Sequence, residues 1–175
     1  NETNIEGAIR LAKDMDNTCM CIQGPPGTGK TYTSAHIIVQ LLSEGKNVGI
    51  TSNSHKAILN LMRAVCMLIK GTATGIKVGG EEDASICRDF PKVKHIGNSG
   101  EAAATYKSGM IGGSAWFFSR ADMQERLDYL FIDEAGQVSV AKLIGMVRST
   151  SNLILLGDQM QLGQPIQGAH PGESG

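Results

Sequence analysis

The sequence predicts an α/β fold built on a parallel sheet with helices on both faces. Short apolar runs alternate along the chain with segments in which apolar residues recur at helical spacing. The runs are almost continuously apolar, as expected for strands that are covered on both faces. The 175 residues suit one compact domain, and 41% apolar and 19% charged residues are typical of a globular protein.

The first half of the chain predicts two strand–helix pairs. A buried strand over Cys19–Gln23 leads into a Gly/Pro turn, and a helix over Lys30–Ser43 follows, with Gly45 as its stop signal. A second strand over Val48–Thr51 leads into an amphipathic helix over His55–Ile69. This order is typical of parallel strands joined by crossover helices.

The second half predicts a less regular region and then further strands. Residues 71–100 hold strand-like pieces around an acidic segment, so we expect an insertion or variable region there. The run Gly109–Gly112 is too short to assign. The elements expected in this half are strands over Ile76–Val78, Val93–Ile96, Tyr129–Ile132 and Leu153–Leu156, and a helix over Val138–Val147.

The composition restricts the binding partners and the cellular compartment that we expect for this protein. The net charge is −1, so a nucleic acid contact would rest on local polar groups or on another domain, not on an overall basic surface. No apolar run approaches the ~18 residues of a membrane span, so we expect no membrane partner. The four cysteines lack paired C-x-x-C spacing, which favours buried, reduced thiols in a cytoplasmic protein. The chain starts without Met and ends in a Gly- and Pro-rich tail, so we expect a piece truncated at both ends.

Residues 24–31 fit the phosphate-loop pattern G-x-x-x-x-G-K-[ST]. Glycines let the backbone wrap a phosphate, and the amides at the following helix start present positive charge to it. The Lys30 ammonium would meet the β- and γ-phosphates, and the Thr31 hydroxyl would be a Mg²⁺ ligand. We therefore predict a site for ATP and Mg²⁺ formed by Gly24, Pro25, Pro26, Gly27, Thr28, Gly29, Lys30, Thr31 and Tyr32.

The apolar strand Tyr129–Ile132 ends in two adjacent acids. We expect this strand to lie beside the phosphate loop, with its carboxyl end facing the ligand. Asp133 would hold Mg²⁺, and Glu134 would polarise the attacking water as general base. A switch protein can manage with the first acid alone, so the second one favours turnover over simple ATP binding.

A third polar cluster, Gly157-Asp158-Gln159-Met160-Gln161-Leu162, follows the last strand. With Asp133-Glu134-Ala135-Gly136-Gln137 and the phosphate loop before it, the chain resembles superfamily 1 helicases. It is most similar to the branch of nonsense-mediated-decay RNA helicases and prokaryotic helicase–nuclease fusions. The runs Gly-Gly-Ser-Ala-Trp at 112–116 and Gly-Gln-Pro-Ile-Gln-Gly at 163–168 fit the fusions. The resemblance covers most of the chain and is weakest over 71–100.

The resemblance implies that residues 1–175 are the first RecA-like motor domain, which hydrolyses ATP and moves 5′ to 3′ on single-stranded DNA or RNA. It implies a second RecA-like domain in the same full-length chain, without which this piece would be weakly active or inactive. It also implies that Gln161 senses the γ-phosphate. The adenine-reading Gln that many relatives place before the first Ala-Ile pair is absent from residues 3–9. No pattern indicates an obligate assembly, so we expect a monomer.

The resemblance further implies that residues 51–56 touch the phosphates of the nucleic acid strand. Small hydroxyl and amide groups at a helix start suit that contact, and the predicted residues are Ser52, Asn53, Ser54 and His55, with Ser114. Helix capping by Ser52, Asn53 or Ser54 is the alternative, and both can hold together. The aromatic run Trp116-Phe117-Phe118 fits either a base-stacking platform or core packing.

Two other function classes stay open at this point. The loop Gly-Pro-Pro-Gly-Thr-Gly-Lys-Thr also occurs in protein-remodelling ATPases of the AAA type, although the cluster after residue 156 is not theirs. A module that binds ATP without turnover is the second alternative, and Glu134 argues against it.

Overall fold

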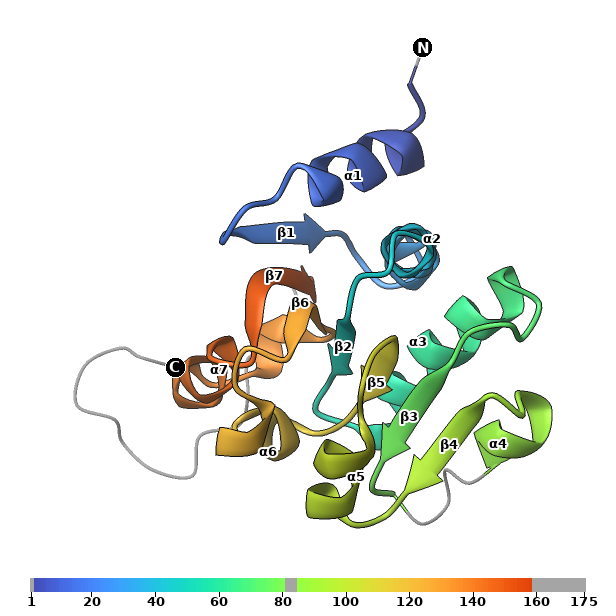
Figure 1. Cartoon of the computed structure of the whole chain (residues 1–175). Coiled ribbons are helices and arrows are strands. Elements are labelled where there is room, and N and C mark those ends of the chain that lie inside the picture. The colour runs from blue at the N-terminus through green and yellow to red at the C-terminus, as the bar shows by residue number, and fades with distance from the viewer. Residues whose placement is uncertain (1, 81–84, 159–175) are drawn as a thin grey trace.

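The computed structural model describes residues 2–80 and 85–158, which form a seven-stranded sheet with every strand parallel to its neighbours (Figure 1). The spatial order is β1-β7-β6-β2-β5-β3-β4. The prediction of a parallel α/β sheet is confirmed. The strands are β1 (Cys19–Gln23), β2 (Val48–Thr51), β3 (Gly75–Val78), β4 (Val93–Ile96), β5 (Met110–Gly112), β6 (Leu127–Ile132) and β7 (Thr150–Gly157).

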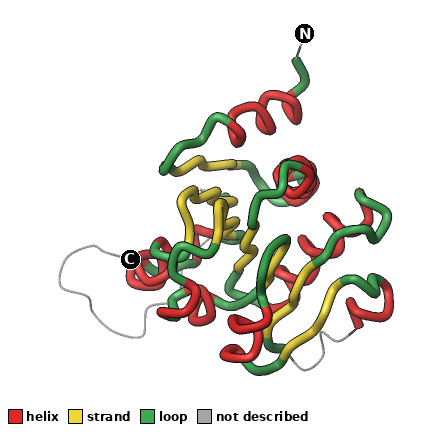
Figure 2. Tube along the Cα trace, in the orientation of Figure 1, coloured by secondary structure: helices red, strands yellow, loops and turns green. Residues whose placement is uncertain are grey.

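Helices cover both faces of the sheet, as the tube in Figure 2 shows. One face packs against α1 (Asn4–Lys13), α2 (Lys30–Ser43), α3 (His55–Leu68) and α4 (Ser85–Asp89). The other packs against α5 (Ser99–Thr105), α6 (Ala115–Phe118), α7 (Val140–Val147) and the 3₁₀ turn η2 (Ala121–Met123). Crossover helices on both faces explain why the central strands are apolar at nearly every position.

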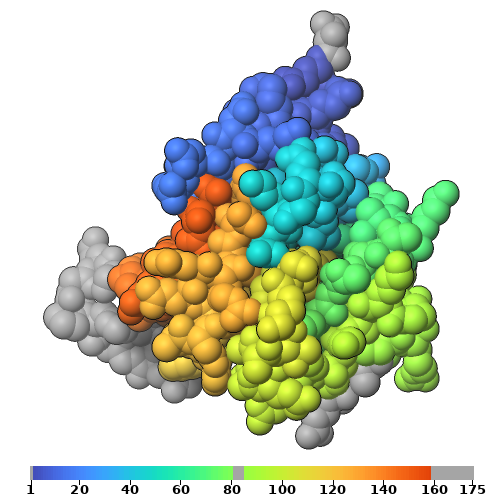
Figure 3. All heavy atoms as spheres, in the orientation of Figure 1, coloured from blue at the N-terminus to red at the C-terminus, as the bar shows by residue number. Residues whose placement is uncertain are grey.

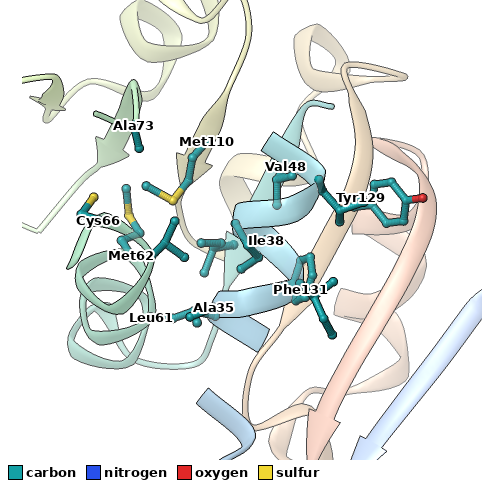
Figure 4. Close-up of a cluster of buried hydrophobic side chains, with 14 of the residues drawn as sticks. Ala35, Ile38, Val48, Leu61, Met62, Cys66, Ala73, Met110, Tyr129 and Phe131 are labelled. Carbon is teal, nitrogen blue, oxygen red and sulfur yellow. The ribbon is translucent and has the colours of Figure 1, made fainter. Parts of the chain in front are cut away.

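The larger core lies between the sheet and helices α2 and α3. In Figure 4, Ile38 and Met62 point from these helices toward Val48 and Met110 of the central strands. All four side chains are fully buried. On the opposite face, β2 carries Gly49 where a Cβ would come within 2.6 Å of a Leu127 methyl, so the close fit there excludes any larger residue.

Helix α1 was not expected from apolar periodicity. Its start is a reciprocal cap: the Thr3 hydroxyl accepts from the Glu6 amide, and the Glu6 carboxylate accepts from the Thr3 amide at 2.8 Å. The Tyr129 hydroxyl of β6 donates to the Ala12 carbonyl at 2.9 Å, which ties this helix to the sheet. In Figure 3, the blue N-terminal segment packs against the cyan α2. The T-x-x-E pattern at residues 3–6 was the available signal.

Two expectations about the strands are wrong. The sequence predicts buried thiols, but Cys19 and Cys21 are exposed on one face of β1, which is an edge strand of the sheet. Cys66 is buried as expected, and burial raises the pKa of its thiol to about 11. The strand that ends in Asp133 does not lie beside the phosphate-loop strand, because β7 is inserted between β1 and β6.

The remaining differences concern element ends and short elements. Helix α7 begins two residues later than predicted, at Val140, and the 3₁₀ turn η3 (Ala135–Gln137) precedes it. Strands β3 and β4, within residues 71–100, form the far edge of the sheet, and β5 joins them to β2. Within residues 2–80 and 85–158, no helix is long and apolar enough to cross a membrane.

Candidate nucleotide-binding and hydrolysis site

The predicted site residues gather at one edge of the sheet because parallel strands end on the same side. Backbone hydrogen bonds fix this edge: Gly24 N donates to Gly157 O at 3.2 Å, and Asp133 N donates to Thr51 O at 2.9 Å. Gly113 N donates to Ile50 O at 3.0 Å, which continues the edge to β5. The phosphate loop, the two acids, residues 52–54 and Ser114 therefore follow one another along this edge.

The phosphate loop has the backbone that its sequence predicts. Gly27 and Gly29 have φ of 79° and 84°, the left-handed region that favours glycine, and α2 begins directly after them at Lys30. The Lys30 ammonium donates to the carbonyls of Gly24 and Pro25, the latter at 3.0 Å. The loop thus curls around its own lysine, with amides at a helix start beside it.

Thr31 and Tyr32 lie on the exposed first turn of α2. The Tyr32 ring is 56% exposed and packs against the His36 imidazole, with ring centroids 4.2 Å apart. Thr31 is an exposed residue at the second position of α2, directly after Lys30. The Tyr32 ring is stacked along its own helix, one residue further on.

Asp133 stands at the carboxyl end of β6 in a half-buried position. Burial raises the pKa of its carboxyl, the neighbouring Glu134 charge adds to the rise, and the Lys30 ammonium opposes it. β7 separates the strand that carries Asp133 from the strand that leads into the phosphate loop. The acid and the phosphate loop therefore lie at the same edge of the sheet, one strand apart.

The donor set at this edge suits Mg²⁺. A carboxylate and a hydroxyl are hard oxygen ligands, and Mg²⁺ is usually held by one or two of these with water and substrate phosphates. A half-buried carboxylate whose ionised form is disfavoured gains from a nearby divalent cation. The described residues hold no cluster of three or more His, Cys, Asp or Glu that would form a metal cage of their own.

Glu134 adopts a left-handed backbone conformation, φ 55° and ψ 40°, which is uncommon for a residue with a side chain. Its amide donates to the Asp133 Oδ1 at 2.9 Å, and its carbonyl accepts from the Gln137 amide at 2.9 Å. The carboxylate accepts a hydrogen bond from the Ser52 hydroxyl of the neighbouring strand exit at 3.1 Å. Sequence reasoning missed this contact, for which an 82-residue separation offers no local signal.

The residues that follow β2 differ in their contacts: one caps a helix, and the others bind neighbouring segments. Ser54 is the N-cap of α3, and its hydroxyl accepts from the Ala57 amide at 3.1 Å. Ser52 contacts Glu134, and the Asn53 side-chain amide donates to the Gln137 carbonyl at 2.8 Å. His55 is exposed at the helix start, and its Nδ1 lies 2.9 Å from the Nζ of the buried Lys77.

The segment after β5 contains the predicted contact residue Ser114 and the aromatic run at 116–118. Ser114 is the N-cap of α6, with its hydroxyl accepting from the Phe117 amide at 3.4 Å. Phe117 and Phe118 are core residues that meet edge to face, whereas Trp116 is 77% exposed. Core packing therefore holds for two of the three aromatics, and Trp116 alone is placed for stacking. Gln161 lies outside the described residues.

The chain is similar to known proteins over most of its length. The family model described as AAA domain matches residues 7–166. The chain is 33% identical over 150 residues to the DNA replication ATP-dependent helicase/nuclease DNA2 of Saccharomyces cerevisiae, covering 81% of this chain and 10% of that protein. It is 29% identical over 165 residues to the DNA replication ATP-dependent helicase/nuclease JHS1 of Arabidopsis thaliana, covering 88% of this chain and 12% of that protein.

A solved structure shares the fold at low sequence identity. It is a nuclease-deletion mutant of the Type ISP restriction-modification enzyme LlaGI in complex with a DNA substrate mimic. The TM-score is 0.60 at 18% identity, with 87% of this chain and 16% of that chain covered.

The fold and the phosphate loop define a P-loop ATPase domain, and the chain belongs to the AAA domain family. Its relatives identify it further as a motor domain of the superfamily 1 helicase type. Because both relatives are named as helicase/nucleases, the protein-remodelling alternative is not favoured. The chain spans only 12% and 10% of their lengths.

Proposed function

We propose that this chain binds and hydrolyses Mg-ATP as the first motor domain of a DNA or RNA helicase. The observation that carries the proposal is the common edge of the sheet at which the phosphate loop, Asp133, Glu134 and residues 52–54 emerge. The motor works with a second RecA-like domain of the same full-length chain, in a monomeric, cytoplasmic protein that moves on single-stranded DNA or RNA. ATP closes the cleft between the domains and hydrolysis opens it.

Each loop residue has a distinct task in this proposal. The amides of residues 24–31 cradle the phosphates, and the Lys30 ammonium turns from its two carbonyls to the β- and γ-phosphates. Bound Mg²⁺, held by Thr31 and Asp133, would neutralise charge on the same phosphate oxygens. Tyr32 flanks the bound nucleotide at the third position of α2.

Hydrolysis requires a base on the far side of the γ-phosphate. Glu134 accepts the proton of the attacking water, and Gln161 couples the γ-phosphate to the nucleic acid groove. Ser52, Asn53, Ser54, His55 and Ser114 offer hydroxyl, amide and imidazole groups to the strand's phosphates along the same edge.

The test measures ATP hydrolysis by the intact protein with and without oligo(dT) or oligo(U). Lys30→Ala should abolish ATP binding. Glu134→Gln should keep binding and lower kcat by about 10²–10⁴-fold, the usual contribution of a general base. Glu101→Gln, an exposed acid on α5 next to β4, at the opposite end of the strand order from the phosphate loop, should leave both unchanged. Hydrolysis that neither oligonucleotide stimulates would refute the motor, and binding without any turnover would favour the ATP-holding module.

A further inference from the structure

We propose that a basic pocket at the amino-terminal ends of β3 and β4 binds the phosphate backbone of nucleic acid, as a second site separate from residues 52–55. The inference goes beyond the proposed function, whose strand contacts lie at the carboxyl ends of the strands. It rests on that function in one respect, because it takes a nucleic acid to be the ligand. This lysine pocket is lined on its polar side by Thr74, Lys92, Lys94, Thr105, Lys107 and Ser108.

Segments from three parts of the chain form the lysine pocket, which has a volume of about 300 Å³. Figure 1 shows β3 and β4 as neighbouring parallel strands at one side of the sheet. Lys92 directly precedes β4, and Lys94 lies opposite Ile76 of β3 in the strand register. Lys107 lies in the turn between α5 and β5. Because β3, β4 and β5 all begin here, the pocket lies at the opposite ends of the strands from the phosphate loop.

The three lysines lack counterions. Arg10 and Arg63 each form an ion pair with a carboxylate, but within residues 2–80 and 85–158 no carboxylate pairs with a lysine of this pocket. Like charges that share a site repel one another, and an anion between them removes that cost. The hydroxyls of Thr74, Thr105 and Ser108 add neutral donors. Ammonium and hydroxyl groups are the donors through which proteins commonly contact phosphate oxygens.

The turn that carries Lys107 is fixed by contacts beneath it. Tyr106 is 1% exposed, and its hydroxyl donates to the Gly109 carbonyl at 2.9 Å. The Arg126 guanidinium donates to the Tyr106 carbonyl. Gly109 has φ 91°, and a Cβ there would come within 2.9 Å of the Thr74 carbonyl oxygen, so the turn packs directly on the start of β3. A turn held in this way loses little conformational freedom when its lysine binds a ligand.

The shape of the pocket favours an extended polymer. All three lysines are exposed, so the pocket is open to solvent. An open polar site suits a backbone with repeated phosphates, whereas pockets for small ligands are usually enclosed and mainly apolar. Among the described residues that line it, none is aromatic, so it has no platform for stacking bases. We therefore expect binding that does not depend on the base sequence.

Protection of an edge strand is the alternative explanation. Lysines on such a strand discourage pairing with another chain, and β4 is the last strand of the sheet. This role accounts for Lys92 and Lys94 but not for Lys107, which lies outside the strand. It predicts aggregation, without loss of nucleic acid binding, when the lysines are replaced.

The experiment compares the intact protein with a variant that carries Lys92→Gln, Lys94→Gln and Lys107→Gln. Fluorescence anisotropy measures the Kd of a labelled 40-nucleotide oligo(dT) over a range of salt concentrations. The loss of three phosphate contacts, at about 0.7 each, should reduce the slope of log K against log salt by about 2. At low salt the Kd should rise about 3- to 100-fold, because each exposed charge pair contributes about 1.5- to fivefold.

The length of the oligonucleotide separates this site from the motor. A domain of this size is about 40 Å across, which corresponds to about 12 nucleotides of stacked strand. An 8-nucleotide oligo(dT) therefore cannot reach from residues 52–55 to the lysine pocket. In the ATP hydrolysis assay, the half-stimulating concentration should be unchanged in the variant for the 8-mer and should rise for the 40-mer. The unstimulated kcat should stay within about twofold.

Matched variants control for charge and for folding. Lys13→Gln, Lys46→Gln and Lys142→Gln together remove the same charge from other parts of the surface and should change the slope by less than about 1. Arginine at positions 92, 94 and 107 keeps the charge and should preserve the Kd.

Several outcomes would overturn the lysine pocket as a nucleic acid site. These are an unchanged Kd and slope in the Gln variant, an equal change in the charge-matched control, and aggregation with normal binding by the soluble fraction. A fourth is calorimetric binding of inorganic tripolyphosphate to the Lys30→Ala protein that the Gln substitutions abolish while the oligo(dT) Kd is unchanged, which would assign the pocket to free phosphoanions. Absent stimulation of wild-type hydrolysis would instead overturn the proposed motor, and the anisotropy measurement would still decide the pocket.

Discussion

Thr51 is the last residue of β2. Substitutions there test whether the stability of the fold and the contact with nucleic acid place opposite demands on one side chain. The side chain is 1% exposed, and its Oγ1 is buried without a hydrogen-bond partner, the one such side-chain atom in the described part of the chain. A buried hydroxyl in that state costs about 1–3 kcal/mol relative to one in water. Its backbone carbonyl, by contrast, is well used, because it accepts from the Asp133 amide at 2.9 Å.

Thr51→Val replaces the hydroxyl by a methyl group of nearly the same shape. The free energy of unfolding should rise by about 1–2 kcal/mol, because the unpaired polar group is removed and no cavity is created. For a chain of this length that corresponds to about 2–8 °C in Tm. Thermal unfolding followed by circular dichroism measures the shift.

Thr51→Ser is the matched control, since it keeps the hydroxyl and loses the buried methyl. It should lower the free energy of unfolding by about 1 kcal/mol. A Thr51→Val protein that is less stable than the wild type would refute the reasoning, because it would mean that the hydroxyl makes a hydrogen bond worth more than its burial costs. If stability rises while stimulation by nucleic acid drops, the hydroxyl serves the strand contact at the expense of the fold.

Two further predictions address the acid and the exposed aromatic ring. Asp133→Asn should raise the Tm of the nucleotide-free protein at neutral pH and remove the stabilisation by Mg-ATP. Because burial raises the pKa of Asp133 above its unfolded value, the wild type loses stability as pH rises through the folded pKa. The advantage of the Asn variant should therefore shrink as pH falls from the folded toward the unfolded pKa, and an advantage that grows on acidification would contradict this sign. Trp116 is the only tryptophan in the chain and is 77% exposed, so its emission reports directly on its surroundings. Saturating oligo(dT) should quench it if the ring stacks on a base, and Trp116→Ala should then weaken binding about 5- to 100-fold; an unaltered spectrum would remove the stacking role.

The elements that sequence reasoning located well are those whose signals are local. The strand Cys19–Gln23, the helix Lys30–Ser43 and the strand Val48–Thr51 have the predicted ends, because a Gly/Pro loop, Gly45 and a Ser/Asn cap mark them. The phosphate loop is equally local. Its backbone follows from glycines at positions that need positive φ.

The features that escaped prediction depend on which strands become neighbours. The place of β7 between β1 and β6 is a topological fact that no window of sequence contains. It decides that the first strand lies at an edge, which in turn exposes Cys19 and Cys21. The contact of Ser52 with Glu134 arises in the same way, from adjacent strand exits. Roles for Gln161 and for the nucleic acid contacts stay predictions.

The Lys30 ammonium, held by the carbonyls of Gly24 and Pro25, has a consequence for the order of events in a catalytic cycle. A cation that already sits inside the loop acts as a template for its curvature, so the glycine backbone need not refold around each arriving triphosphate. The same two carbonyls compete with the phosphates for that cation, which weakens ground-state affinity. In the proposed motor, such a lysine would favour rapid exchange of nucleotide over tight retention.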